Sequence, residues 1–430
     1  MNSTLKSMLI AAAAITSVSA FAQDKATLDL LVKKGLITAE ERAKTLDEAA
    51  KARSASGLNK VFVKEDAVSR LTFSGRLQTQ WEGISYEETS AAGVVTPATD
   101  VSKAFMRRMY LGVNAAITDG ASAELVWNFA DSSLDKGYFT LDTSVGQFNL
   151  GYQKVQWGLE ENTSSSKLVT VERSMVTRYW AEGANGRRLG FGARHNGLHY
   201  SNKATLDGTS ALGYGFAVVS EQQGYATTGN DIGLYANLVY SFTTGGGKNA
   251  IGLNWGSTNY MDAANAPFVQ ANGDVSKMTG FNPYVQLAFG QFGLQADYQM
   301  STLDPVSATV ASAGGIERKP NGYNVIATYK FDDNYEAVVR YSALDTDGRG
   351  QKASDGFRDS PATATYDKSS SWYVGVNYYI NGHNAKVMLG YEKAKLNDQI
   401  SGYGAATGTA NTTAGKADAD IFRLQAQVLF

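Results

Sequence analysis

Residues Gln147 to Gly197 read QFNLGYQKVQWGLEENTSSSKLVTVERSMVTRYWAEGANGRRLGFGARHNG, and this stretch decides which fold is expected. Apolar and polar residues alternate from Phe148 to Gln153, and they alternate again from Leu189 to Arg194. Alternation with a period of two predicts a half-buried strand on each side. The residues between show no alternation, and a connection of about thirty residues is too long to be idle in a compact fold. The sequence therefore predicts two strands separated by a functional insertion.

The same alternation continues outside this stretch, from Leu71 to the last residue. Clear examples are Leu71–Trp81, Phe292–Gln299, Tyr335–Tyr341 and Ala385–Glu392. Each segment has one apolar face with aromatic residues near its ends and one polar face. Many such strands of about ten residues favour a transmembrane β-barrel over a soluble sandwich.

The links between these segments are alternately short and mostly long, as expected for tight periplasmic turns and larger outer loops. The expected short links are 118–120, 145–146, 201–211, 243–248, 290–291, 332–333 and 381–382. The expected outer links are 85–102, 131–136, 157–188, 221–229, 261–278, 301–320, 345–369 and 396–415. Seven inner and eight outer links predict an all-β, 16-stranded antiparallel barrel over residues 58–430. A further strand over residues 199–206 would make the count odd and place the barrel's two ends on opposite sides, so we assign 201–211 as a turn.

The last strand supports this interpretation independently. Phe422, Leu424, Ala426 and Val428 alternate with polar neighbours, and the chain ends on the aromatic Phe430. This ending resembles the C-terminal signal that the outer-membrane assembly machinery reads.

The first 57 residues have a different pattern. Residues 1–22 are typical of a Sec-type signal peptide, with Lys6, an apolar run too short to span a bilayer, and an A-x-A site that predicts cleavage after Ala22. Residues 23–57 predict a short helical segment, whose second helix begins at a capping box of Thr38 and Glu41. This segment is either a solvated helical pair with no partner or a periplasmic coiled coil that tethers the envelope.

Composition excludes several classes of function. The net charge is −2, which gives no indication of nucleic-acid binding. The chain contains no cysteine, so a disulfide framework and a thiolate metal site are both excluded. His195 and His199 are about 13 Å apart on a strand and cannot share a metal. Asp345, Asp347 and Gly348 resemble the start of a calcium loop, but we interpret them as a solvated acidic loop. We expect no catalytic residues, no metal and no cofactor.

The insertion resembles the phosphate-selective porin O/P family of bacterial outer membranes. The matching pieces are residues 158–161 (GLEE), 164–165 (SS), 172–174 (ERS) and 186–190 (GRRLG). Gln156-Trp157 stands where many members have Pro-Phe. The resemblance implies that residues 157–188 form the third outer loop, folded into the barrel to make its narrow point. It also implies a homotrimer in the outer-membrane lipid, and an N-terminal segment such as many relatives carry.

Basic residues on and near the insertion are the candidates for a pore constriction that binds small anions such as phosphate, because planar guanidinium donors can meet two oxygens at once. They are Arg76, Arg108, Lys167, Arg173, Arg178, Arg187, Arg188 and Arg194. No Lys or Arg lies between Lys203 and Lys248, so a continuous basic ladder around the wall is not expected. A general porin fits about as well, and so does a sugar-permeable one that uses aromatic residues of the insertion, Trp157, Tyr179 and Trp180.

Overall fold

The computed structural model describes residues 32–34, 38–40, 42, 70–182, 187–223, 232–259, 275–305, 316–358, 364–403 and 409–430. The chain divides into two units, Met1–Ser69 and Arg70–Phe430. In the first unit Val32, Lys33, Ala39, Glu40 and Arg42 are helical.

The start of a helix at Thr38 agrees with the capping box in the sequence. The backbone N–H of Arg42 donates to the carbonyl of Thr38 over 3.0 Å, which is the first hydrogen bond of a helical turn. The expected signal peptide, residues 1–22, lies outside the described residues. Among the helices that the structure describes, none is long and apolar enough to cross a membrane.

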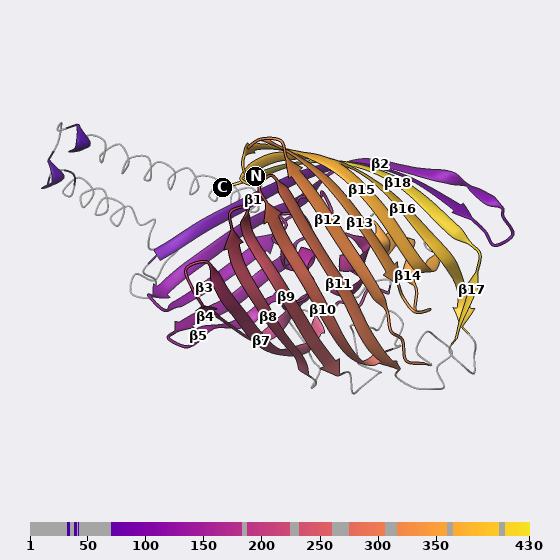
Figure 1. Ribbon diagram of the computed structural model, residues 1–430, viewed down its shortest axis with the longest axis horizontal. Helices are drawn as coiled ribbons and strands as arrows, with labels where there is room; N and C mark the ends of the chain where they lie inside the picture. Colours follow the sequence, from indigo (N-terminus) through magenta and orange to yellow (C-terminus); the bar gives the residue numbers. More distant parts are fainter. Residues whose placement is uncertain are drawn as a thin grey trace, which may run out of the picture. The chain divides into compact units, whose positions relative to one another are not determined.

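The second unit is one antiparallel sheet (Figure 1). Its strands are β1 (Arg70–Thr89), β2 (Val95–Thr118), β3 (Ala121–Asn128), β4 (Ser133–Thr143), β5 (Gly146–Lys154), β6 (Arg194–Thr205), β7 (Ser210–Gln223), β8 (Ile232–Thr244), β9 (Gly247–Asn259), β10 (Val275–Phe289), β11 (Phe292–Pro305), β12 (Asn321–Lys330), β13 (Tyr335–Asp345), β14 (Gln351–Lys352), β15 (Thr365–Asn381), β16 (Ala385–Tyr403), β17 (Ala410–Thr413) and β18 (Lys416–Leu429). Three short helices are α4 (Leu159–Asn162), α5 (Met175–Ala181) and α6 (Ala353–Gly356).

The sheet closes on itself because β1 pairs with β18, from Arg76 opposite Leu429 to Thr89 opposite Lys416. The two shortest strands, β14 and β17, lie in outer links, since β13 pairs directly with β15 and β16 directly with β18. Among the described residues the wall therefore has 16 strands, and the predicted fold class is confirmed.

The two faces of the wall differ as the alternation requires. Apolar side chains such as Leu150, Ile251 and Leu389 are exposed on the outside. Polar side chains such as Gln78 and Arg340 point inward and are buried. An outer apolar face suits contact with lipid.

Several boundaries differ from the predictions. β16 continues to Tyr403, into the link predicted at 396–415, and β11 continues to Pro305, into the link predicted at 301–320. Three further differences have a clear cause or change the assigned role of a segment. The link predicted at 85–102 is a hairpin turn at residues 90–94, because β1 and β2 stay hydrogen-bonded from Thr89 and Val95 inward after their apolar alternation has ended. The turn predicted at 201–211 is shorter, residues 206–209, where Asp207 accepts hydrogen bonds from two following backbone N–H groups, those of Thr209 and Ser210. Residues 189–193, predicted to be a strand, belong to the insertion, which spans residues 155–193 rather than 157–188.

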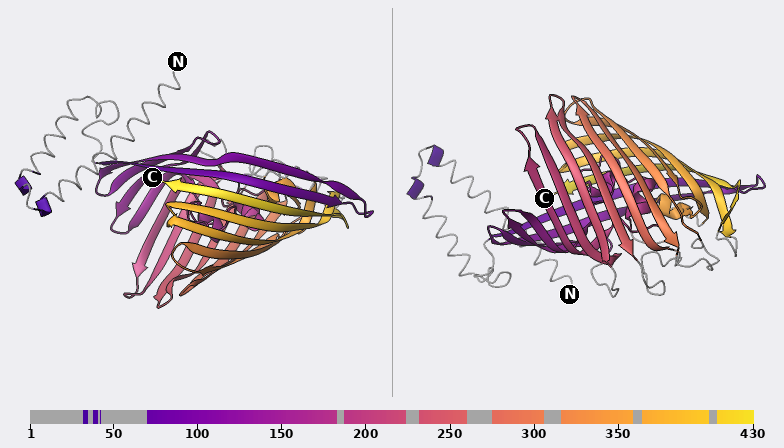
Figure 2. Two further views of the ribbon diagram at one scale, coloured as in Figure 1. Left: turned by 90° about the horizontal axis from the view of Figure 1, so that it is seen from above. Right: turned by 60° about the horizontal axis from the view of Figure 1, so that its bottom comes forward.

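The barrel wall is lower on one side, which we call the low wall, because the strands there are short. β2 pairs with β3 only from Tyr110 inward, although β2 begins at Val95, and β3, β4 and β5 are short strands. Figure 2 shows the hairpin of β1 and β2 reaching past the ends of these strands.

Closure of the barrel predicts a role for the last residue. Phe430 exchanges two backbone hydrogen bonds with Gly75, of 2.6 and 3.1 Å, and its ring lies over that glycine. Deleting Phe430 removes both bonds and the ring, so we expect a loss of about 1–3 kcal/mol, measured as the shift of the urea unfolding midpoint in detergent. Phe430→Ala keeps the backbone bonds and should lose less. Equal losses in the two variants would contradict a backbone contribution to closure.

Candidate functional site

The insertion, residues 155–193, lies inside the ring of strands and carries α4 and α5 (Figure 2). Its apolar residues pack on the inner wall, and glycines in the wall make room for them. A Cβ at Gly280 of β10 would lie 2.6 Å from the ring of Trp157, and one at Gly322 of β12 would lie 3.2 Å from Val176. Both Trp157 and Val176 are completely buried. The insertion is therefore packed like a protein core against one side of the lumen.

Arg340 of β13 holds the other side of the insertion. Its guanidinium is fully buried and donates to Glu160 at 3.1 Å, to Glu392 of β16 at 2.9 Å and to the carbonyl of Glu172 at 2.7 Å. The second oxygen of Glu160 accepts from the backbone N–H of Ser174 at 2.8 Å. A single wall cation thus joins the beginning and the middle of the insertion.

The charges continue from Arg340 along the wall as a belt of alternating sign. Glu392 lies 3.5 Å from Arg423 of β18, which lies 3.1 Å from Glu82 of β1. Glu82 in turn lies 3.4 Å from Lys103 of β2. This charge belt, Arg340–Glu392–Arg423–Glu82–Lys103, crosses the seam where the barrel closes and pairs each charge with an opposite one.

The lower part of the insertion, residues 164–169, is fixed through its own carbonyl groups. Wall side chains donate to the carbonyls of Ser165, Ser166, Leu168 and Val169, and the donors are Gln78, Gln427, Lys386 and Asn377. Because these donors come from β1, β18, β16 and β15, the segment is held along a quarter of the barrel. The backbone carbonyls therefore point at the wall rather than into the remaining pore.

A group of cations lies between the insertion and the low wall. We call it the cationic eyelet: it contains Arg76, Arg108, Lys154, Arg173 and Arg194, together with Asp135 and Glu161. These cations are close enough to act on one another electrostatically. The eyelet has five positive and two negative groups.

The contacts inside the eyelet are of two kinds. Arg194 pairs with Asp135 at 2.6 Å, and Arg173 pairs with Glu161 at 2.8 Å, while Lys154 also pairs with Glu161. Arg76 and Arg108 bind only neutral groups in the part of the chain that the structure describes. Arg76 donates to the hydroxyls of Ser164 and Ser165, and Arg108 donates to Gln78 at 2.8 Å. Two guanidinium groups of the eyelet are therefore left without a carboxylate.

The structure brings four of the eight predicted anion-binding residues into the eyelet: Arg76, Arg108, Arg173 and Arg194. Arg173 also donates to three carbonyls, those of Glu160, Glu161 and Thr163, so it shapes the insertion itself. Sequence reasoning missed Lys154. Its position directly before the insertion was the signal that could have revealed it, because the residue that enters a constriction loop must lie at the constriction.

The other four predicted residues lie elsewhere. Lys167 is exposed and lines a cavity of about 660 Å³ below the insertion. Arg178 and Arg188 belong to the insertion itself and pair with Glu182 at 3.1 and 2.7 Å. Arg187 donates to the hydroxyl of Tyr403 at 2.6 Å. These residues do not form one binding site.

Burial and charge shift the pKa values in this outer group. Burial acts to raise the pKa of Glu182, but Arg178, Arg358 and Arg188 outweigh it and hold the pKa below its usual range. Burial raises the pKa of Asp355 to about 6, and Arg188, 3.8 Å away, opposes this only in part. Asp355 is therefore a carboxylate that changes charge close to neutral pH.

The aromatic residues and the acidic loop do not form further sites. Trp157, Tyr179 and Trp180 are each completely buried in the packing between insertion and wall, so they do not line a path for solutes. Asp345 accepts from the backbone N–H of Asp347, as in an ordinary turn. Within the described ranges, no group of three or more His, Asp or Glu residues could hold a metal ion.

The sequence profile of the phosphate-selective porin O and P family matches residues 84–430. The chain belongs to this family. Its closed 16-stranded barrel with an inserted loop is the fold of an outer-membrane porin, and family and fold indicate a channel rather than an enzyme. No curated protein sequence matches the chain.

The chain is similar to several solved structures at low sequence identity. The anion-selective porin from Comamonas acidovorans is 16% identical, with 83% of this chain and 99% of that chain covered and a TM-score of 0.50. OmpT, an outer membrane protein of Vibrio cholerae, is 15% identical, with 84% and 99% covered and a TM-score of 0.49. The outer membrane channel DcaP of Acinetobacter baumannii is 14% identical, with 86% and 99% covered and a TM-score of 0.49.

The anchor at Arg340 predicts a large stability effect. Arg340→Met leaves Glu160 and Glu392 buried without their shared partner, and breaking a buried ion pair in this way costs about 3–5 kcal/mol. We expect a lower urea midpoint together with noisier single-channel currents, because the insertion is no longer fixed. Lys368→Met is the control, since Lys368 pairs with Asp398 on the exposed surface at 3.0 Å and should contribute less than about 1 kcal/mol. Equal losses would show that Arg340 is not the anchor.

Asp355 predicts a dependence of selectivity on pH. Below about pH 6 this carboxyl takes up a proton, so the outer group around Arg178, Arg188, Lys352 and Glu182 gains one positive charge. The anion-to-cation permeability ratio should therefore rise between pH 8 and pH 5, as measured from reversal potentials. Asp355→Asn should keep the low-pH ratio at both values. An unchanged pH step in this variant would rule out Asp355 as its source.

Proposed function

We propose that this porin lets small anions diffuse passively across the outer membrane and that the cationic eyelet selects them. The observation that carries the proposal is the composition of the eyelet, five positive groups against two carboxylates, in a chain whose net charge is −2. The anion preference thus comes from a local cluster of charges, so the protein as a whole need not carry a positive net charge.

Physical chemistry gives a local cluster most of the influence on a passing ion. Salt screens charges beyond a Debye length of about 8 Å at physiological ionic strength. Low-dielectric walls concentrate the field inside a narrow passage. An ion therefore responds mainly to the charges at the narrowest place, and in this proposal that place is the eyelet.

The exposures of the eyelet residues support a division of tasks. The side chains of Arg194 and Lys154 are 27% and 21% exposed, so they can meet a solute. Arg173 is 7% exposed and is bound to carbonyls of the insertion, so it contributes charge and shape rather than contact. A guanidinium beside an ammonium group suits a phosphate-like anion with several oxygens.

The charge belt supports a single constriction rather than a ladder of anion sites. Each of its cations faces a carboxylate within 3.5 Å. Its net effect on an ion passing through the lumen is small for that reason. The specificity that the family description names therefore depends here on the eyelet.

Several properties complete the proposal. The chain is exported by a Sec-type signal peptide cleaved after Ala22, its outer apolar face contacts outer-membrane lipid, and it assembles as a homotrimer. We assign it no catalytic site and no cofactor. Residues 23–57 form a periplasmic segment that tethers the envelope.

This tethering role predicts the effect of a deletion. Deleting residues 24–57 should weaken the envelope and leave the conductance of the channel unchanged.

Ion selectivity in planar bilayers tests the eyelet. Under a salt gradient the reversal potential should favour anions, and added phosphate should reduce the current. A unit charge about 5 Å away in water-like surroundings is worth about 0.8 kcal/mol, so neutralising two charges with Lys154→Gln and Arg194→Gln should lower the anion preference about tenfold. Lys319→Gln is the control, because this side chain is 68% exposed on an outer link.

Three outcomes would contradict the proposal. Currents that favour cations would exclude anion selection. An equal effect of the Lys319 and eyelet variants would place the selectivity elsewhere. A wild-type protein with no selectivity and no phosphate block would be a general porin, the alternative that the sequence leaves open.

A further inference from the structure

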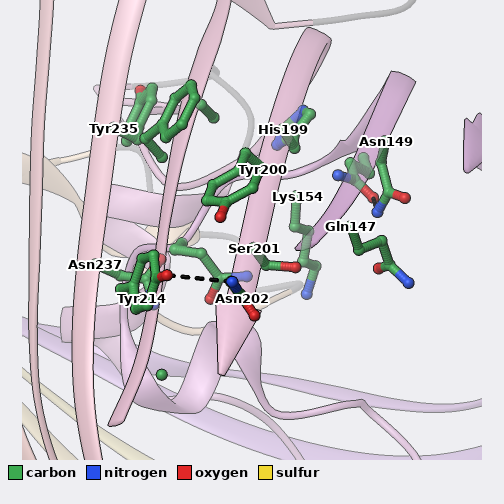
Figure 3. A pocket seen from close by; sticks show the side chains of 15 residues that line it. Gln147, Asn149, Lys154, His199, Tyr200, Ser201, Asn202, Tyr214, Tyr235 and Asn237 are labelled. Atoms are coloured by element: carbon green, nitrogen blue, oxygen red, sulfur yellow. Dashed lines mark hydrogen bonds between the residues drawn. The ribbon is translucent and has the colours of Figure 1, made fainter. Parts of the chain in front are cut away.

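A side cavity lies beside the eyelet, lined by residues of β5, β6, β7 and β8 (Figure 3). Its volume is about 360 Å³. Small-molecule sites typically have volumes of about 300–1,000 Å³. The cavity is separate from the space below the insertion that Lys167 lines, because the two share no lining residue.

The chemistry of the cavity walls is unusual for a site that would hold a simple inorganic anion. Six side-chain amides line it, together with hydroxyl groups, one histidine and a single cation, Lys154. None of the described residues that line it is a carboxylate. Each amide offers one carbonyl acceptor beside its two N–H donors. The carbonyls of Asn149, Gln153 and Asn202 already accept hydrogen bonds within the protein, and those of Gln147, Gln156 and Asn237 accept none from the described residues. An occupant that donates hydrogen bonds as well as accepting them therefore suits the cavity.

Several of these polar groups have no partner within the described part of the chain. The Nε2 atom of His199 is buried without a hydrogen bond, and the whole residue is only 8% exposed. The side chains of Asn237, Ser201 and Gln156 also form no hydrogen bond with a described residue, but Ser201 and Gln156 are exposed and Asn237 is half-buried, so water can satisfy these three when no ligand is bound. Buried polar groups are normally satisfied, so an unsatisfied one beside a cavity indicates a ligand or bound water.

Lys154 connects the cavity to the eyelet. Its ammonium binds the carboxylate of Glu161 and the carbonyl of the same residue at 2.7 Å. An ammonium has three donors, so one remains for a solute. Because Lys154 lines the cavity and also belongs to the eyelet, an anionic group held there would place the rest of the same molecule among the amides.

We propose that this side cavity binds small hydroxylated monocarboxylates, the class of sugar acids, with the carboxylate on Lys154 and the hydroxyl groups on Asn237 and His199. Hydroxyl groups both donate and accept, so they satisfy amide carbonyls that a phosphate dianion would repel. A neutral sugar lacks the charge that Lys154 attracts. This inference deepens the proposed anion preference and rests on it, since both use Lys154.

Glycine in the wall provides a means of blocking the cavity. Gly213 of β7 lines it, and a Cβ built there would have nothing closer than 3.8 Å. A large side chain at this position can therefore enter the cavity without disturbing the strand. Ser241 of β8 lies four residues from Asn237 on the same inner face but does not line the cavity, so it offers a matched control.

The test is calorimetric titration of the purified full-length porin in detergent with gluconate, glucose and inorganic phosphate. Gluconate should bind more tightly than the other two. Asn237→Leu should weaken gluconate binding about tenfold, the effect of one lost hydrogen bond, and Gly213→Phe should abolish it. Ser241→Leu should bind like the wild type, and heat-modifiable gel mobility should show that all variants are folded.

These measurements distinguish a failure of the cavity proposal from a failure of the proposed anion selection by the eyelet. Glucose or phosphate binding as tightly as gluconate would overturn the assignment, and so would gluconate binding that survives Gly213→Phe. In either case an anion-favouring reversal potential of the wild type would leave the eyelet proposal intact. Conversely, gluconate binding that depends on Asn237 in a channel without anion preference would uphold the cavity and reject the eyelet as the filter.

Discussion

The buried guanidinium of Arg340 is the interaction on which the narrowed pore depends. It binds Glu160 at 3.1 Å and Glu392 at 2.9 Å, and it donates to the carbonyl of Glu172. A charge in the barrel interior, out of contact with water, is tolerated only when it is paired and hydrogen-bonded. Glu160 of the insertion supplies part of that pairing. The wall residue Arg340 therefore depends on the insertion, and the position of the insertion depends on Arg340.

This arrangement divides the charged residues of the lumen into two groups. From Arg340 to Lys103 the wall carries alternating charges that neutralise one another. Next to them, between the insertion and the low wall of β3 to β5, the eyelet keeps more cations than carboxylates, and it shares strands β1 and β2 with the belt. The belt and the eyelet therefore differ in how many of their cations contact a carboxylate, although they share these two strands of the wall.

Motifs that resemble a family need not be the residues that contact the solute. Glu160, Glu172 and Arg173 belong to the pieces that carry the resemblance, and each is buried in contacts that shape the insertion. Glu172 binds Arg107, and Arg173 binds Glu161 and neighbouring carbonyls. Such residues preserve the position of the loop, whereas more exposed neighbours such as Arg194 are free to differ with the solute.

The sequence by itself determined the barrel, because alternation with a period of two is local, and a strand exposed to lipid on one face must show it. Alternation gave a wrong prediction at residues 189–193, whose apolar residues alternate but pack inside the lumen. Alternation indicates which side chains are buried, and it does not indicate which surface buries them. Only the tertiary structure decided the pore site. It brought Arg76 close to Arg173 and Arg194, 97 and 118 residues away in sequence, and it paired Arg340 with Glu160, 180 residues away. No local pattern reports which cations will meet a carboxylate across the lumen, because that depends on where the insertion folds back.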